Sequence, residues 1–117
     1  LSAETHQMID VDALMKMKQS AILVNAARGP VVDTNALILA LAEGWIAGAA
    51  LDVVDPEPLP GGHPLYAFAN CLITPHIGSS TLRTRQAMAE LACQNLLAGV
   101  AGKRLPQCAN PDLYNLG

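Results

Sequence analysis

Three short apolar segments, each followed by a turn and then a helical pattern, constrain the fold of this chain more than any other feature. They cover residues 21–25, 45–52 and 72–74. The first is apolar without alternation, which is typical of a strand covered on both faces. Strands that alternate with helices form parallel βαβ units with right-handed crossovers. We therefore predict an α/β fold with a parallel sheet and flanking helices.

Helix signals lie before, between and after these strands. Each combines a side chain that can accept hydrogen bonds from a first helical turn with apolar residues at helical spacing, and some end at a glycine. In chain order they predict a short helix capped by Asp10 or Asp12, a helix from Asp33 to Gly44, and a helical turn over residues 63–68. The last is a helix over residues 81–100, capped by Ser79, Ser80 or Thr81 and ended by Gly99 and Gly102.

Composition argues against several classes of protein. The 117 residues are enough for one domain with a real core. The net charge is −3 and the basic residues are scattered, so no nucleic-acid partner is expected. The apolar runs are far shorter than the roughly 20 residues of a membrane span, and no signal-peptide layout opens the chain.

The cysteines and histidines point to the cytoplasm and away from a metal site. Three cysteines without C-x-x-C spacing favour reduced thiols, as in a cytoplasmic protein. The histidines share no ligand-like spacing with them, so no metal is expected. Two of the histidines, His6 and His63, have no functional setting in the sequence, and we expect both to be surface residues.

Charged residues follow all three predicted strands. Arg28 follows the first, Asp52 and Glu57 follow the second, and His76 follows the third. The carboxyl ends of parallel strands share one edge of a sheet, and ligands of open α/β sheets bind there. We therefore expect one cation, two acids and one imidazole to line a single crevice.

This set of residues suits chemistry on a 2-oxo acid. A guanidinium such as Arg28 can hold a carboxylate through two parallel hydrogen bonds. An imidazole changes charge near neutral pH, and Glu57, in a stiff loop between two prolines, would keep His76 protonated. His76 would then protonate the carbonyl oxygen as hydride reaches the carbon.

Each residue also has a simpler interpretation when it is taken alone. Arg28 would be a surface arginine beside a turn in which Gly29 frees the backbone, and Glu57 a solvated loop acid. His76 would cap a helix or lie in the core, and Asp52 is as well suited to capping a turn as to facing a ligand. The coincidence of all four at one edge favours the functional interpretation.

Three stretches of the chain resemble the D-isomer-specific 2-hydroxyacid dehydrogenases in order and spacing. They are residues 25–33, 48–58 and 74–80, and the resemblance is nearest to the glyoxylate/hydroxypyruvate reductase or 2-ketogluconate reductase branch. It implies that residues 1–104 are the C-terminal part of a Rossmann-like, doubly wound NAD(P)-binding domain. Residues 105–117 would form a tail that returns toward a substrate domain outside this chain.

The resemblance also implies a reaction and a set of site residues. The cofactor would be NAD or NADP, the substrate a small 2-oxo acid reduced to a D-2-hydroxy acid, and the intact enzyme a homodimer. Asp52 would face the nicotinamide carboxamide, and Gly78 and Ser79 would lie near the nicotinamide or the substrate. The implied catalytic residues are Arg28, Glu57 and His76, and the implied cofactor contacts are Ala26, Ala27, Arg28, Asp52, His76, Gly78 and Ser79.

No G-x-G-x-x-G turn occurs in the 117 residues, so the pyrophosphate cradle of such an enzyme lies outside this sequence. We expect this chain alone to have no dehydrogenase activity. One alternative is a nucleotide-sensing interaction protein, as in the family's corepressor members, because a sensor can keep the same residues. Another is a truncated product without a role of its own, whose exposed sheet edges pair with a second copy.

Overall fold

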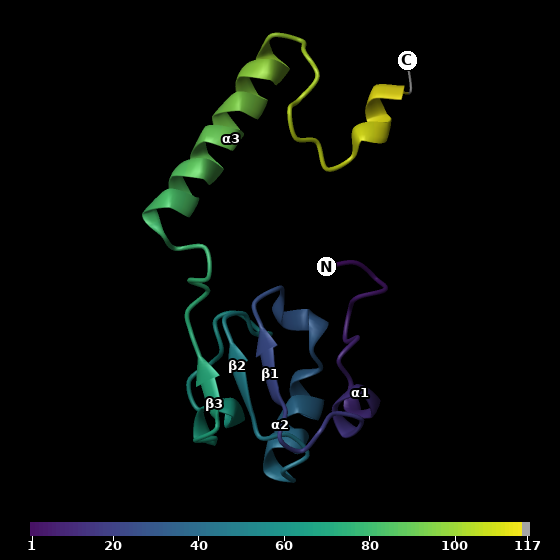
Figure 1. Cartoon of the computed structure of the whole chain (residues 1–117), viewed down its shortest axis with the longest axis vertical. Coiled ribbons are helices and arrows are strands. Elements are labelled where there is room, and N and C mark those ends of the chain that lie inside the picture. The colour runs from purple at the N-terminus through teal and green to yellow at the C-terminus, as the bar shows by residue number, and fades with distance from the viewer. Residues whose placement is uncertain (116–117) are drawn as a thin grey trace. The chain divides into compact units, whose positions relative to one another are not determined.

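The computed structural model describes residues 1–115 and is built on a three-stranded parallel sheet (Figure 1). The strands β1 (Ile22–Asn25), β2 (Gly48–Leu51) and β3 (Cys71–Ile73) lie in the order β1-β2-β3. The register pairs Asn25 with Leu51 and Leu51 with Ile73, so all three strands end at the same edge. The predicted α/β fold is confirmed.

The helices begin at the predicted capping residues. Asp10 caps α1 (Val11–Met15), Asp33 caps α2 (Thr34–Ala42) and Thr81 caps α3 (Leu82–Val100), each through its side-chain oxygen. Short 3-10 helices lie at η1 (Gly29–Val31), η2 (Pro64–Ala67) and η3 (Pro111–Asn115).

Two of the three glycines predicted to end helices do so. Gly44 and Gly102 follow the last turns of α2 and α3 with φ of 67° and 66°, the left-handed conformation that favours glycine. Gly99 lies inside α3, so its prediction as a helix end is wrong. A single glycine is tolerated in a helix at a cost of about 1 kcal/mol relative to alanine, and the helix continues through it.

The chain divides into two compact units, Leu1–Gly78 and the segment from Ser79 onward. The first unit contains the sheet and a hydrophobic core in which α2 supplies the largest share of buried side chains. Full burial of each large aliphatic side chain contributes about 1.5–3 kcal/mol. The fully buried large side chains are Leu14, Leu37, Ile46, Val53 and Leu65.

The other face of the sheet is exposed, which corrects the expectation that the first strand is covered on both faces. Ile22, Val24 and Leu72 are 65%, 68% and 63% exposed. The strand order advances in one direction, and right-handed crossovers then place both connections on the same face. The described residues therefore cover one face only.

The second unit consists of α3 and the segment that follows it. Within the described part of the chain, α3 buries none of its side chains, and its predicted apolar stripe through Met88, Leu91 and Leu96 is exposed. After α3, the guanidinium of Arg104 lies 4.9 Å from the centre of the Tyr114 ring. The end of the predicted tail, residues 116–117, lies outside the described residues, and the domain boundary at residue 104 stays a prediction.

None of the helices found in residues 1–115 combines the length and the hydropathy that crossing a membrane requires.

Candidate functional site

The carboxyl edge of the sheet carries the residues that the sequence singles out. Arg28 follows β1, Asp52 follows β2 and His76 follows β3, each within three residues of the end of the strand. Glu57 reaches the same edge from the proline-rich loop after β2, since it is bonded to His76. The roles of these residues stay predictions, but their positions can be described.

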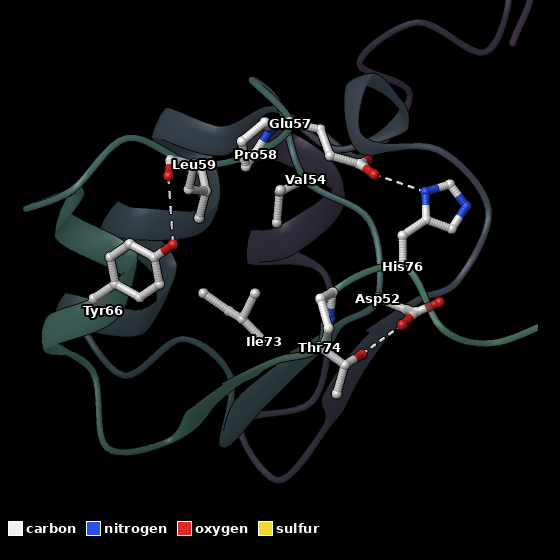
Figure 2. A pocket seen from close by; sticks show the side chains of 10 residues that line it. Asp52, Val54, Glu57, Pro58, Leu59, Tyr66, Ile73, Thr74 and His76 are labelled. Atoms are coloured by element: carbon white, nitrogen blue, oxygen red, sulfur yellow. Dashed lines mark hydrogen bonds and ion pairs between the residues drawn. The ribbon is translucent and has the colours of Figure 1, made fainter. Parts of the chain in front are cut away.

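Glu57 and His76 form a hydrogen-bonded pair (Figure 2). The distance from Oε1 of Glu57 to Nδ1 of His76 is 2.7 Å. An ionised carboxylate only accepts hydrogen bonds, so Nδ1 carries the proton and Nε2 is left for another partner. The side chains are 41% and 47% exposed, so solvent partly screens the pair.

Asp52 accepts hydrogen bonds from the turn that carries His76. Its Oδ1 accepts from Oγ1 of Thr74 at 2.6 Å and from the amide of Ile77 at 2.8 Å, and its Oδ2 accepts from the amide of Gly78 at 2.7 Å. The bond from Thr74 and then that from Ile77 are the main causes that hold the pKa of Asp52 below its ordinary value, against the opposing effect of desolvation. Asp52 is therefore ionised at neutral pH.

The backbone of His76 lies in the left-handed region, with φ of 53°. This conformation is uncommon for a residue other than glycine and needs support from its surroundings. The Asp52 bonds reach the amides of the two residues that follow His76. A Cβ added at Gly78 would lie 2.9 Å from Oδ2 of Asp52, so a glycine allows the close approach.

The turn that carries Arg28 is held by Asn25, the last residue of β1. Asn25 is only 5% exposed; its Oδ1 accepts from the amide of Ala27 at 3.1 Å and its Nδ2 donates to the carbonyl of Arg28 at 3.0 Å. Arg28 itself is exposed, and its Nη1 donates to the carbonyl of Ala27 at 2.6 Å. The backbone is fixed while most of the guanidinium is available to a ligand.

Gly29 serves this turn in a way that differs from the expectation. Its φ is not positive, so the turn does not need glycine for conformational freedom. A Cβ at Gly29 would instead overlap the carbonyl oxygen of Val54, in the segment that leads to Glu57. The missing side chain lets the Arg28 turn and the Glu57 loop approach each other.

The described residues do not connect all the predicted site residues. They contain no hydrogen bond or ion pair between Arg28 and either Glu57 or His76. Ala26 and Ala27 are exposed in the Arg28 turn, as a contact to a ligand requires. Ser79 is half-buried and is the first residue of the second compact unit.

A cavity of about 440 Å³ adjoins the Glu57–His76 pair, a volume in the range of small-molecule sites. In Figure 2 the pair lies at its margin, and Val54, Leu59, Tyr66 and Ile73 surround its interior. The Tyr66 hydroxyl donates to the carbonyl of Leu59 at 3.5 Å. The lining residues are Asp52, Val54, Glu57, Pro58, Leu59, Tyr66, Ile73, Thr74, Pro75 and His76.

The supporting roles of Asn25 and Thr74 are not among the features predicted from the sequence. Both are polar residues at the end of an apolar strand, and that position is the signal that could have identified them. The expectation for His63 is wrong: it is half-buried, and its Nδ1 accepts from the amide of Leu65 at the start of η2. His6 is exposed, as expected.

Comparison with known proteins gives a family match. Residues 1–78 match the family described as D-isomer specific 2-hydroxyacid dehydrogenase, NAD binding domain. The chain is 54% identical to a glyoxylate reductase of Thermofilum pendens over 116 residues, which are 99% of this chain and 34% of that protein. It is 50% identical to the human glyoxylate reductase/hydroxypyruvate reductase over 106 residues, 91% of this chain and 32% of that one.

A solved structure of a similar reductase is consistent with this family match. The chain is similar to the NADPH-dependent glyoxylate/hydroxypyruvate reductase of Sinorhizobium meliloti, determined in complex with NADP and malonate, with a TM-score of 0.86 and 36% identity. The match covers 94% of this chain and 34% of that one. This chain thus spans about a third of the length of the relatives that it matches.

Proposed function

This chain belongs to the D-isomer-specific 2-hydroxyacid dehydrogenase family, and we propose that it supplies the acid/base and the substrate-binding cation of an NAD(P)-dependent reductase. The substrate is a small 2-oxo acid of the glyoxylate or hydroxypyruvate kind, and the product is the corresponding 2-hydroxy acid, of D configuration where its carbon is chiral. The observation that carries this proposal is the 2.7 Å Glu57–His76 pair at the sheet edge that also bears Arg28.

The residues present fit the nicotinamide end of the cofactor. The turn after β1 offers the small exposed residues Ala26 and Ala27, and Asp52 at the end of β2 uses three of the roughly four acceptor positions of a carboxylate. The bound cofactor would supply the hydride. Gly78 and Ser79 would border the same region, and the pyrophosphate would be held outside this chain, which has no G-x-G-x-x-G turn.

Arg28 and His76 divide the remaining work. The guanidinium of Arg28 has N–H groups beyond the one bonded to Ala27, and it would hold the substrate carboxylate through paired hydrogen bonds. The Nε2–H of His76 would give its proton to the carbonyl oxygen, which becomes the hydroxyl of the product. Glu57 would keep the imidazole oriented through its hydrogen bond to Nδ1.

We also propose that the intact enzyme is a homodimer and cytoplasmic, the latter because three cysteines without C-x-x-C spacing favour reduced thiols. Because the matched relatives are about three times as long as this chain, the complete active site includes segments beyond these residues. We therefore expect the 117-residue chain alone to show no turnover of NADH or NADPH with glyoxylate. Clear turnover by the isolated chain would contradict that expectation.

A chimera tests the proposed function directly. This chain would replace the matched 34% of the Thermofilum pendens glyoxylate reductase, and turnover of glyoxylate or hydroxypyruvate would be measured with NADH and NADPH. We expect kcat within about tenfold of that of the unmodified reductase, and a loss of at least about 100-fold in the His76→Gln variant, with cofactor affinity kept.

The negative outcomes of this experiment are separable. A folded chimera that binds NADH but turns over neither substrate would favour the nucleotide-sensing alternative. An active chimera whose kcat is unchanged by His76→Gln would remove the acid/base role from His76.

A further inference from the structure

The turn that carries His76 is held by one carboxylate from the neighbouring strand. Asp52 directly follows β2. Its three bonding partners, Thr74, Ile77 and Gly78, lie before and after His76 in the turn that follows β3. The three hydrogen bonds are 2.6, 2.8 and 2.7 Å long. Two of them end on the amides that directly follow the left-handed residue His76, so they oppose relaxation of this backbone.

Thr74 completes this arrangement. Its hydroxyl donates to Oδ1 of Asp52, the oxygen that also receives the amide of Ile77. The Asp52 carboxylate is thus bonded to a residue before His76 in the sequence, through the Thr74 hydroxyl. It is also bonded to the two residues after His76, through their amides. The hydrogen bond from Glu57 to His76 is made at Nδ1 of the imidazole ring. Glu57 therefore orients the ring and the Asp52 carboxylate orients the backbone that bears it.

We propose that Asp52 and Thr74 are positioning residues that set the backbone of His76 and thereby aim its Nε2 at the reacting carbonyl. This inference rests on the proposed acid/base role of His76. It assigns to Thr74 a function in the reaction that does not involve contact with substrate or cofactor. Misplacing a reacting group by about 1 Å can cost on the order of 100-fold in rate.

The same arrangement separates positioning from cofactor binding. If Asp52 served mainly to bind the nicotinamide carboxamide, loss of the Thr74 hydroxyl would change the KM for the cofactor. If the carboxylate mainly positions His76, the loss would lower kcat and leave both KM values nearly unchanged. Hydride and proton transfer would then limit the rate more strongly, and the isotope effect measured with 4-deuterated NADH or NADPH would rise.

The first arm of the test is kinetic and uses the chimera. Thr74→Val keeps the shape of the side chain and removes the donor, and we expect kcat to fall about tenfold with both KM values within about twofold. Thr74→Ser restores the donor and should return kcat to within about twofold of the parent. Thr5→Val is the matched control, because within residues 1–115 the hydrogen bonds of the Thr5 hydroxyl are confined to the segment that starts the chain.

Asp52→Asn should have a larger effect than Thr74→Val. The amide oxygen can replace one carboxylate oxygen, but the amide nitrogen would then face at least one backbone N–H as donor against donor. We expect kcat to fall about 100-fold.

The second arm needs no turnover. Hydrogen exchange of the peptide that contains Ile77 and Gly78, followed by mass spectrometry without cofactor, should become about tenfold faster in Asp52→Asn and remain unchanged in Thr5→Val. An inactive chimera with this protection pattern would refute the proposed function while keeping the hydrogen-bonding arrangement. An active chimera in which Thr74→Val leaves kcat and the isotope effect unchanged would overturn the positioning role, as would exchange unaffected by Asp52→Asn.

Discussion

The Arg28 turn (residues 25–29) and the His76 turn (residues 74–78) follow parallel strands of the same sheet, yet they are held differently. In the Arg28 turn, Asn25 bonds to Ala27 and Arg28, two and three residues away. In the His76 turn, the bonds come from Asp52, 22 to 26 residues away in the sequence. One turn is stabilised locally by a neutral amide, and the other across strands by an ionised carboxylate.

The functional side chains of the two turns also differ in how firmly they are held. The ring of His76 is fixed by Glu57, whereas the guanidinium of Arg28 bonds only to the carbonyl beside it among the described residues. Proton transfer requires a donor aligned with its acceptor, while the N–H groups of Arg28 beyond the one bonded to Ala27 are available to pair with a carboxylate. The comparison indicates that, at this edge of the sheet, the side chain proposed to transfer a proton is held more firmly than the side chain proposed to bind the carboxylate.

Glu57→Gln should have the largest effect, because it replaces the carboxylate that orients the imidazole of His76 by a neutral amide. We expect kcat for reduction in the chimera to fall about 100-fold, with the KM for the cofactor nearly unchanged. Glu57→Asp is the matched control, since it keeps the charge at a shorter reach and should lose less. A larger loss in Glu57→Asp than in Glu57→Gln would show that reach, rather than charge, decides the role of Glu57.

Asn25→Ala tests whether the Arg28 turn depends on its local support. The change removes two part-buried hydrogen bonds of a buried side chain, each worth about 1 kcal/mol, so we expect the free energy of unfolding to fall by about 2 kcal/mol. Asn70→Ala is the control, because the Asn70 side chain is exposed and makes one bond to the carbonyl of Ala47. The free energy of unfolding would be measured by urea unfolding of the chimera. Equal decreases for both variants would contradict the proposal that Asn25 supports the Arg28 turn.

Arg28→Lys sharpens the comparison at the side chain. Lysine keeps the charge but cannot form the paired hydrogen bonds of a guanidinium, so we expect the KM for glyoxylate to rise about tenfold while the KM for the cofactor stays nearly constant. Steady-state kinetics of the chimera would measure both. A change confined to the cofactor KM would mean that Arg28 contacts the cofactor rather than the substrate.

The contrast between the two turns also explains which features could be predicted. The caps Asp33 and Thr81 and the parallel sheet depend on residues close in sequence or on hydrophobic pattern, and these predictions are confirmed. The bond from Thr74 to Asp52 and the contact of Gly29 with Val54 join segments that meet only after folding. No local pattern encodes such contacts.

The exposed sheet face was missed for a related reason. An unbroken apolar run such as residues 21–25 indicates that both faces of a strand are suited to burial, but it does not say which segment covers each face. In the described residues Ile22 and Val24 remain exposed, because both crossovers lie on the opposite face.

The smallest expected effect separates the two turns by their response to acid. The pKa of Asp52 is lowered, chiefly by the hydrogen bond from Thr74, so ionised Asp52 stabilises the folded state at every pH above its ordinary value of 3.8. That stabilisation is lost as the pH falls through the lowered pKa. The difference in urea midpoint between the parent chimera and Asp52→Asn should therefore be constant from pH 7 to about pH 5 and shrink below about pH 4. The difference in urea midpoint between the parent and Asn25→Ala should keep its size over the same range, because an amide does not titrate. If the difference for Asp52→Asn also persists in acid, the charge of the Asp52 carboxylate does not hold the His76 turn.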